Sequence, residues 1–287
     1  MWVQLVLQSL INGVSLGALY VLMASGFTMA FGVMKVVNFA HGEFYMLGAL
    51  FSYVLTEAIG LHYLFVLVIA PIVVAAFGFV TEKTLFQPIL RNQLDCMILS
   101  LGLSLVLQQS ANIFFGSEAL FFPSLIRGTI PLFNLMLPAD RAVVVLASGA
   151  IMTAYLLFLK FSKLGNAIRA VSQDPETARV QGIPVNRTMA AGFSVSVFLA
   201  AIAGVVIGPV LTVSTTMGAA AILKAFMVVI LGGLGSIEGA ILMGILVGMS
   251  ESLFSTFIGG QYSDIFLFTV ILCVLWIKRP SLFETNL

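Results

Sequence analysis

Long apolar runs, separated by short groups of charged and turn-forming residues, dominate the pattern along the chain. A helix that crosses a bilayer needs about 20 mainly apolar residues, and counting such runs gives about eight candidate spans. They lie at roughly 8–33, 38–56, 62–80, 97–115, 141–159, 189–211, 219–234 joined to 237–258, and 262–277. The run 219–258 is too long for one span and contains Gly232, Gly233 and Gly235, which predicts two helices. We expect 38–56 to be partly re-entrant.

The composition places this pattern in a membrane. The chain has 287 residues, of which 60% are hydrophobic and only 9% charged, whereas roughly 25% of residues are charged in a soluble domain. The sequence therefore predicts an all-α, polytopic membrane protein with one transmembrane domain over 1–287. A net charge of +1 argues against nucleic acid as a partner. The first charged residue is Lys35, so we expect the first segment to remain as a span and not to be a cleaved signal peptide.

Basic residues in short loops predict the orientation, because cytoplasmic loops are enriched in Lys and Arg. An N-terminus outside and a C-terminus inside place most of them in the cytoplasm: Lys35, Lys83, Arg91, five residues within 160–187, Lys278 and Arg279. Arg127 and Arg141 then lie outside, and Lys224 lies within a span. The outer loop of about 116–140 is rich in Pro, Phe and Leu. It is either a lid or docking rim over the outer mouth, or a passive loop at the headgroup layer.

The predicted cytoplasmic loop, residues 160–187, contains a short helix with a start and a stop signal. Asp174 is a good N-cap, Pro175 suits the first helical position, and Glu176 complements the positive end of the helix dipole. Ala178 and Arg179 follow within the helix, and Gly182 suits its C-terminal end. A helix of about two turns is marginal alone in water and needs a packing partner. It is either a docking helix for a soluble cytoplasmic subunit or a surface helix that orders the loop.

Ionisable residues at membrane depth are costly and usually face a partner or a water-filled cavity. His41 and Glu43, near Asn38, are candidates for lining or gating a pathway. The alternative is a helix-entry turn at the cytoplasmic interface, with Asn38 as the cap. Two such residues without further ligands nearby do not predict a metal site.

Lys224 and Glu251 are the other candidates for the pathway. Lys224 either attracts the carboxylate of an amino acid, pairs with Glu251, or extends to the outer interface. For Glu251, a buried ion pair or a protonated, hydrogen-bonded carboxyl is expected before direct contact with a solute.

Glycines indicate close helix packing or helix breaks. The candidates are Gly42, Gly232, Gly233, Gly235 and Gly239, and the pair Gly244–Gly248 has the four-residue spacing of a helix face. The GGLGS turn at 232–236 is a candidate break in a discontinuous helix, as transporters have near their solute sites. The polar breaks NFAHGE (38–43) and GGLGSIEG (232–239) occupy loosely corresponding places, which hints at an internal repeat.

Several of these motifs together resemble those of a known family. They are 12–17 (NGVSLG), 26–29 (GFTM), 38–43 (NFAHGE), 165–170 (GNAIRA), 174–183 (DPETARVQGI), 224–226 (KAF) and 232–240 (GGLGSIEGA). In order and spacing they resemble bacterial inner-membrane permeases of the branched-chain amino acid type, within ATP-binding cassette importers. The resemblance covers nearly the whole chain and is closer to the H-type subunit than to the M-type.

The resemblance implies a second permease subunit, usually in a heterodimer, two cytoplasmic ATPase subunits and a periplasmic solute-binding protein. The chain has no phosphate-binding loop motif, so it is not expected to be an enzyme, and ATP and Mg would be bound by the partners. The implied solute is a branched-chain or similar amino acid. Related permeases handle urea, short amides, or aromatic and carboxylic acids, and these alternatives stay open. A stand-alone secondary transporter would need more intramembrane carboxylates than Glu43 and Glu251.

Overall fold

The computed structural model describes residues 2–90, 92–122, 128–132 and 135–277. Its first part contains α1 (Trp2–Met34), α2 (His41–Tyr53), the π-helix η1 (Val54–Ala58), α3 (Tyr63–Thr81), the π-helix η2 (Glu82–Phe86), the 3₁₀-helix η3 (Gln87–Ile89) and α4 (Gln93–Phe115). A short antiparallel hairpin follows, β1 (Thr129–Leu132) and β2 (Leu135–Pro138). The rest is helical: α5 (Ala139–Phe161), α6 (Lys163–Gln173), α7 (Pro175–Val180), α8 (Val185–Ile207), α9 (Met217–Gly232), α10 (Ile237–Phe257) and α11 (Gly260–Ile277).

The helices confirm the prediction of an all-α, multi-pass membrane protein. Within the described residues, six helices are long and apolar enough to cross a bilayer, and shorter apolar helices accompany them. Every predicted apolar run contains a helix, and the run 219–258 is two helices, α9 and α10, as expected. The small β-hairpin was not expected; it lies within the predicted outer loop. The expectations that rest on Arg91, Pro123, Arg127, Lys278 and Arg279 lie outside the described residues.

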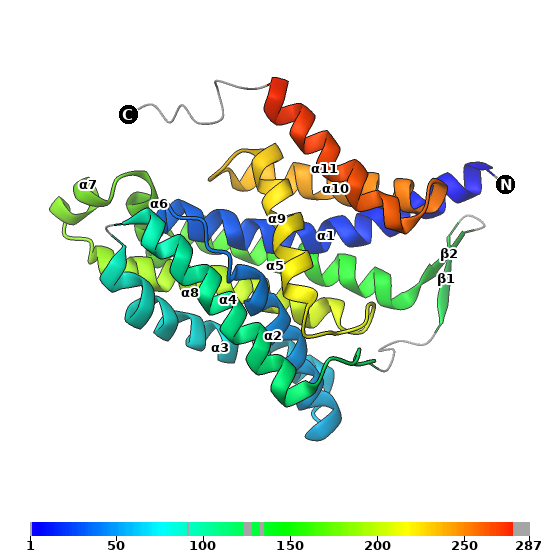
Figure 1. Ribbon diagram of the computed structural model, residues 1–287, viewed down its shortest axis with the longest axis horizontal. Coiled ribbons are helices and arrows are strands. Elements are labelled where there is room, and N and C mark those ends of the chain that lie inside the picture. Colours follow the sequence, from blue (N-terminus) through cyan, green and yellow to red (C-terminus); the bar gives the residue numbers. More distant parts are fainter. Residues whose placement is uncertain (1, 91, 123–127, 133–134, 278–287) are drawn as a thin grey trace.

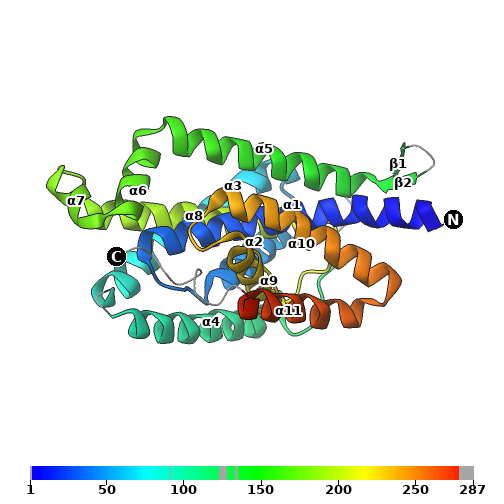
Figure 2. The same ribbon diagram turned by 90° about the horizontal axis from the view of Figure 1, so that it is seen from above.

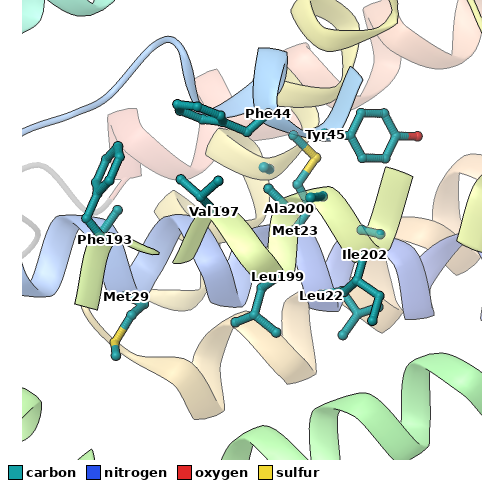
Figure 3. Close-up of a cluster of buried hydrophobic side chains, with 14 of the residues drawn as sticks. Leu22, Met23, Met29, Phe44, Tyr45, Phe193, Val197, Leu199, Ala200 and Ile202 are labelled. Atoms are coloured by element: carbon teal, nitrogen blue, oxygen red, sulfur yellow. The ribbon is translucent and has the colours of Figure 1, made fainter. Parts of the chain in front are cut away.

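The centre of the molecule is α8. In its most apolar window, 78% of the residues are buried, against 17% in α4. Side chains of α1, α2 and α8 converge in the core, among them Met23, Phe44 and Phe193 (Figure 3). Peripheral helices instead expose large apolar side chains, such as Ile98 and Phe114 of α4, as a lipid-facing surface requires.

The core helices form two sets of four, α1–α4 and α8–α11, arranged in opposite directions. α1 packs antiparallel to α8, with Gly26 against Ser196 and Val33 against Gly192. The first helix of each set also packs on the third helix of the other, α1 on α10 and α8 on α3. The second helices, α2 and α9, meet at their first residues. Inverted repeats of this kind are common in membrane transporters.

This arrangement corrects the expected correspondence between NFAHGE and GGLGSIEG. The counterpart of the 35–40 segment, which leads from α1 to α2, is the 208–216 segment, which leads from α8 to α9. The GGLGS stretch is a tight turn between α9 and α10 and not a break within one helix. Gly233 and Gly235 have φ of +94° and +87°, and the chain folds back so that Gly239 touches Gly232. The sequence pattern missed this because a run of glycines fits either a break or a turn.

The molecule is elongated along the direction of α1 (Figure 1). One end contains α7, and we call it the α7 end; the other contains β1 and β2, and we call it the hairpin end. In the view from above, α5 runs along one side of the molecule while α4 and α11 lie on the opposite side (Figure 2). The segment α5–α7 is inserted between the two sets of four helices and carries the predicted coupling loop out to the α7 end.

Candidate functional site

The α7 helix at one end of the molecule has both of the caps that its sequence predicts. One carboxylate oxygen of Asp174 accepts hydrogen bonds from the backbone N–H groups of Glu176 (2.9 Å) and Thr177 (3.2 Å). The Thr177 hydroxyl donates to the other oxygen, at 2.5 Å. These bonds, with the Thr177 hydroxyl contributing most, lower the pKa of Asp174 below its ordinary value. Asp174 is therefore charged at neutral pH and holds the first turn.

The other end of α7 closes with a glycine turn. Gly182 has a φ of +83°, its N–H donates to the Arg179 carbonyl (3.0 Å), and the Ile183 N–H donates to the Ala178 carbonyl (3.1 Å). This is the Schellman pattern of helix termination. A six-residue helix that is marginal on its own is thus held at both ends by side-chain and backbone bonds.

The exposed surface of α7 is suited to contact with another molecule. Ala178 is buried against the rest of the chain, while Val180 is 89% exposed at the tip. Glu176 and Arg179 are also exposed. A groove of about 500 Å³ beside the helix is lined by Pro175 and Arg179 of α7 together with residues of η3 and α8. The coupling role predicted for Asp174 to Gly182 stays a prediction.

The second candidate region is the start of α2, which lies deep in the protein. His41 is fully buried; its Nε2 donates to the Met23 carbonyl oxygen (3.3 Å), and its Nδ1 lies 3.5 Å from the hydroxyl oxygen of Ser196. Ser196 is the central residue of α8. His41 begins α2 and Glu43 lies in its first turn, as the helix-entry interpretation predicts. The geometry argues against placing this turn at the interface, because the 35–40 segment carries the chain from the end of α1 back to the level of the middle of α8.

Glu43, in the first turn of α2, makes a hydrogen bond to a helix that the sequence did not associate with it. The Ser104 hydroxyl donates to one carboxylate oxygen of Glu43 at 3.0 Å, and Ser104 is the central residue of α4. One turn earlier, Ser100 accepts a bond from the Phe39 N–H (3.1 Å). These serines lie one turn apart on one face of α4, within its apolar central part. The second Glu43 oxygen has no hydrogen-bond partner among the residues the structure describes.

Asn38 does not cap α2 directly. The N-cap residue is Ala40, and the side-chain oxygen of Asn38 accepts from the Ala40 N–H at 3.0 Å. Asn38 therefore shapes the turn before the helix. Gly42 is required for close approach, because a Cβ there would overlap the carbonyl oxygen of Gly218. Whether Asn38, His41 and Glu43 line or gate a pathway stays a prediction.

The third candidate region joins four helices through Lys224 of α9. Its ammonium group pairs with Glu251 of α10 and lies 3.3 Å from a carboxylate oxygen of Asp264 on α11. Tyr20 of α1 donates a 2.6 Å hydrogen bond to the other oxygen of Glu251. The sequence left three roles open for Lys224: attraction of a solute carboxylate, an ion pair with Glu251, or extension to the outer interface. The structure contains the ion pair with Glu251.

The charges of this cluster bear on the idea that Lys224 attracts a solute carboxylate. Two carboxylates already face the one ammonium group, and Lys224 and Glu251 are mostly buried, with side-chain exposures of 20% and 12%. The cluster therefore carries no unmatched positive charge. This geometry favours a structural ion pair over direct attraction of an anion.

A cavity of about 170 Å³ adjoins this cluster, and we call it the α9 cavity. Its walls come from α1, α2, the end of α8, the following loop and the first turns of α9. Most of the lining is aliphatic, and Tyr20, Tyr45, Thr212 and Lys224 contribute polar or amphipathic side chains.

Sequence reasoning assigned no role to Tyr20, which belongs to the family resemblance, and did not single out Ser104, Ser196 or Asp264. A hydroxyl residue inside an apolar helix is common and usually bonds to its own backbone, so the pattern could not single these residues out. The glycines were better signals. A Cβ on Gly13 would lie 2.5 Å from the Met249 Cα, one on Gly17 would lie 2.8 Å from the Ile245 Cα, and Gly244 and Gly248 of α10 pack on the same face of α1.

The apolar spans, the inverted sets of helices and the deep start of α2 together define a multi-pass membrane protein of a transporter class. The sequence matches the family described as "Branched-chain amino acid transport system / permease component" over residues 9–275. The chain belongs to this family.

Individual relatives agree with the family assignment. The chain is 33% identical to the high-affinity branched-chain amino acid transport system permease protein LivH of Salmonella typhimurium, over 96% of this chain and 94% of the relative. It is 32% identical to BraD of Pseudomonas aeruginosa, over 96% and 94%. It is 26% identical to LivM of Escherichia coli, over 98% of this chain and 71% of that protein. The higher identity to LivH agrees with the predicted H-type resemblance.

The fold is also similar to a solved structure, PsaBC from Streptococcus pneumoniae in complex with Fab. The TM-score is 0.52 at 16% identity, and the match covers 93% of this chain and 90% of that one. At this identity the similarity concerns the fold alone.

Proposed function

We propose that this chain is the H-type permease subunit of an ATP-driven importer in the bacterial inner membrane, and that its solutes are branched-chain or similar amino acids. The family and the names of the relatives support the solute class. In this proposal a second permease subunit completes the translocation path, two ATPase subunits bind ATP and Mg on the cytoplasmic side, and a periplasmic protein delivers the solute.

The observation that carries the proposal is the form of α7. It is a rigidly capped helix whose tip residue, Val180, is an apolar side chain exposed to 89%. Burial of such a side chain by a partner is favourable by about 25 cal/mol per Å² of apolar surface. Arg179 and the adjacent groove supply polar contacts beside it. A cytoplasmic subunit that binds here would move α7 and the attached start of α8.

This role assigns the α7 end to the cytoplasm and the hairpin end to the outside. Lys160, Lys163, Arg169 and Arg187 all belong to the loop at the α7 end, in agreement with the enrichment of basic residues in cytoplasmic loops. Cysteine labelling of intact cells tests the orientation: in a background without Cys96 and Cys273, an introduced cysteine at the exposed Lys163 position should react only after the membrane is made permeable.

The experiment for the function is purification of the complex with reconstitution in vesicles. We expect two ATPase subunits and a second permease to co-purify, and leucine uptake to require ATP inside and a solute-binding protein outside. Val180→Asp should weaken retention of the ATPase subunits, whereas Leu164→Asp, at an exposed apolar residue of α6 in the same loop, provides a control for a general effect of a new charge. A chain that purifies alone and moves solute with an ion gradient would contradict the proposal.

A further inference from the structure

The segment 208–216, which we call the cover segment, forms one wall of the α9 cavity. Leu211, Thr212 and the following Met217 line the cavity from this side. Leu211 and Thr212 are themselves exposed. The cover segment therefore lies at the surface of the protein on this side of the cavity.

The cover segment is bonded to the loop that follows α4. The Leu120 N–H donates to the Val213 carbonyl (2.8 Å), and the Val213 N–H donates back to the Leu120 carbonyl (3.0 Å). The Thr215 hydroxyl donates to the Gly116 carbonyl (3.4 Å), and the Phe122 ring packs on Gly208. Because of these contacts, residues 116–122 and 208–216 are held together as one unit, although they are far apart in the sequence.

The size and lining of the cavity indicate what it would hold. Its volume of about 170 Å³ is similar to that of an engineered apolar cavity of about 150 Å³ that binds benzene. It therefore has room for an aliphatic or small aromatic group. Of the polar side chains on its walls, Tyr20 and Lys224 are already bound to Glu251. Tyr45 and Thr212 therefore remain as hydrogen-bonding groups for a polar end of the same molecule.

We propose that the α9 cavity is a chamber for the apolar side chain of the transported solute, and that the cover segment, together with 116–122, is its outer gate. The proposal rests on the proposed function, because it assumes that this chain transports branched-chain or similar amino acids. Solute entry then requires the cover segment to move away from α9, and the Leu120–Val213 bonds make the loop after α4 move with it. Phe121, which is 74% exposed beside this bridge, is a contact point on the moving unit.

Filling the cavity tests the chamber. Ala221 lines the cavity, whereas Ala219 of the same helix is exposed and provides the matched control. Ala221→Leu should reduce the uptake of leucine by about tenfold or more relative to that of alanine, since hydrophobic pockets discriminate by this amount per methylene. Ala219→Leu should leave the ratio unchanged. The ratio of the two uptake rates separates a change of size selectivity from a general loss of folded protein.

Locking the cover segment tests the gate. Leu120 and Val213 form a reciprocal hydrogen-bonded pair, whose Cα atoms are typically about 5.5 Å apart, a separation that a disulfide can bridge. The variant is L120C/V213C with Cys96→Ala and Cys273→Ala, and it locks the two segments to each other. A second pair, T212C/A221C, places one cysteine on the cover segment and one on α9, both lining the cavity. A bifunctional thiol reagent that is long enough to span the cavity and contains a cleavable disulfide joins them and would block both opening and filling.

We expect cross-linked T212C/A221C to lose uptake and to regain it when reductant cleaves the linker, while oxidised L120C/V213C remains active because its two segments move together. The single-cysteine variants should be insensitive to oxidant. Full uptake by cross-linked T212C/A221C, or unchanged selectivity in Ala221→Leu, would overturn the chamber while ATP-driven leucine uptake by the wild-type complex still supported the proposed function. Absence of ATP-driven uptake by the wild-type complex would instead refute the proposed function itself.

Discussion

Gly42 and Gly218 touch through their backbones, so that the first turns of α2 and α9 meet inside the protein. Helix dipoles place partial positive charge at both starts, and Glu43 lies between them. A Cβ on Gly218 would come within 2.6 Å of a Glu43 carboxylate oxygen and 2.7 Å of the Gly42 carbonyl oxygen. The contact exists because neither residue has a side chain.

We therefore expect Gly218→Ala to force the two helix starts apart and to lower uptake severalfold, with loss of thermal stability of about 1–3 kcal/mol as for other overpacked sites. Gly102→Ala is the control, because nothing lies within 4 Å of the Cβ that it would add to α4. Uptake and the melting temperature of the purified complex measure the effect. Wild-type behaviour of Gly218→Ala would show that this contact can relax at no cost.

The cluster of Lys224 predicts a strong effect of removing one partner alone. Lys224→Met leaves Glu251 with Tyr20 but without a cation in a mostly buried site. Removing one partner of a buried pair typically costs about 3–5 kcal/mol, so the melting temperature should fall. The double variant Lys224→Met/Glu251→Leu should recover most of that loss. A double variant no more stable than the single one would show that Glu251 is not the group that Lys224 neutralises.

The caps of α7 predict a difference between two substitutions at one position. Asp174→Ala removes the oxygens that hold the Glu176 and Thr177 N–H groups, whereas Asn is about as good an N-cap as Asp. We expect Asp174→Ala to lower solute uptake per ATP hydrolysed, and Asp174→Asn to stay close to wild type. Measuring uptake and ATP hydrolysis on the same vesicles distinguishes uncoupling from loss of the complex. Equal loss in both variants would mean that the charge, and not the cap, is required.

The bond from Ser104 predicts that α4 contributes to the deep start of α2. Ser104→Ala leaves both Glu43 oxygens without a donor among the described residues, and a buried acceptor left unsatisfied costs about 1–3 kcal/mol. Uptake should fall while Thr153→Ala, which removes a hydroxyl bonded only within α5, has little effect. Normal uptake and stability of Ser104→Ala would indicate that water replaces the hydroxyl.

Local patterns in the sequence were sufficient to predict the class of the protein and much of its local structure. Apolar runs of sufficient length predict spans because an isolated backbone in lipid must bond within its own helix. The caps of α7 could be predicted from the sequence, because Asp174, Pro175 and Gly182 act on the backbone of residues next to them in the chain. The four-residue spacing of Gly244 and Gly248 likewise indicated a packing face.

The positions of the polar residues, in contrast, depend on the tertiary structure. The depth of His41 depends on how far the 35–40 segment returns into the protein before α2 begins. Its position beside Ser196 could therefore not be predicted from the sequence. The bond between Glu43 and Ser104 and the cluster of Lys224, Glu251 and Tyr20 join helices far apart in the sequence. The glycine-rich stretch 232–236 fits a turn between helices and a break within one helix equally well. Only the packing of Gly239 on Gly232 distinguished the two possibilities. Long-range contacts of this kind depend on how helices are arranged around α8, which no local pattern specifies.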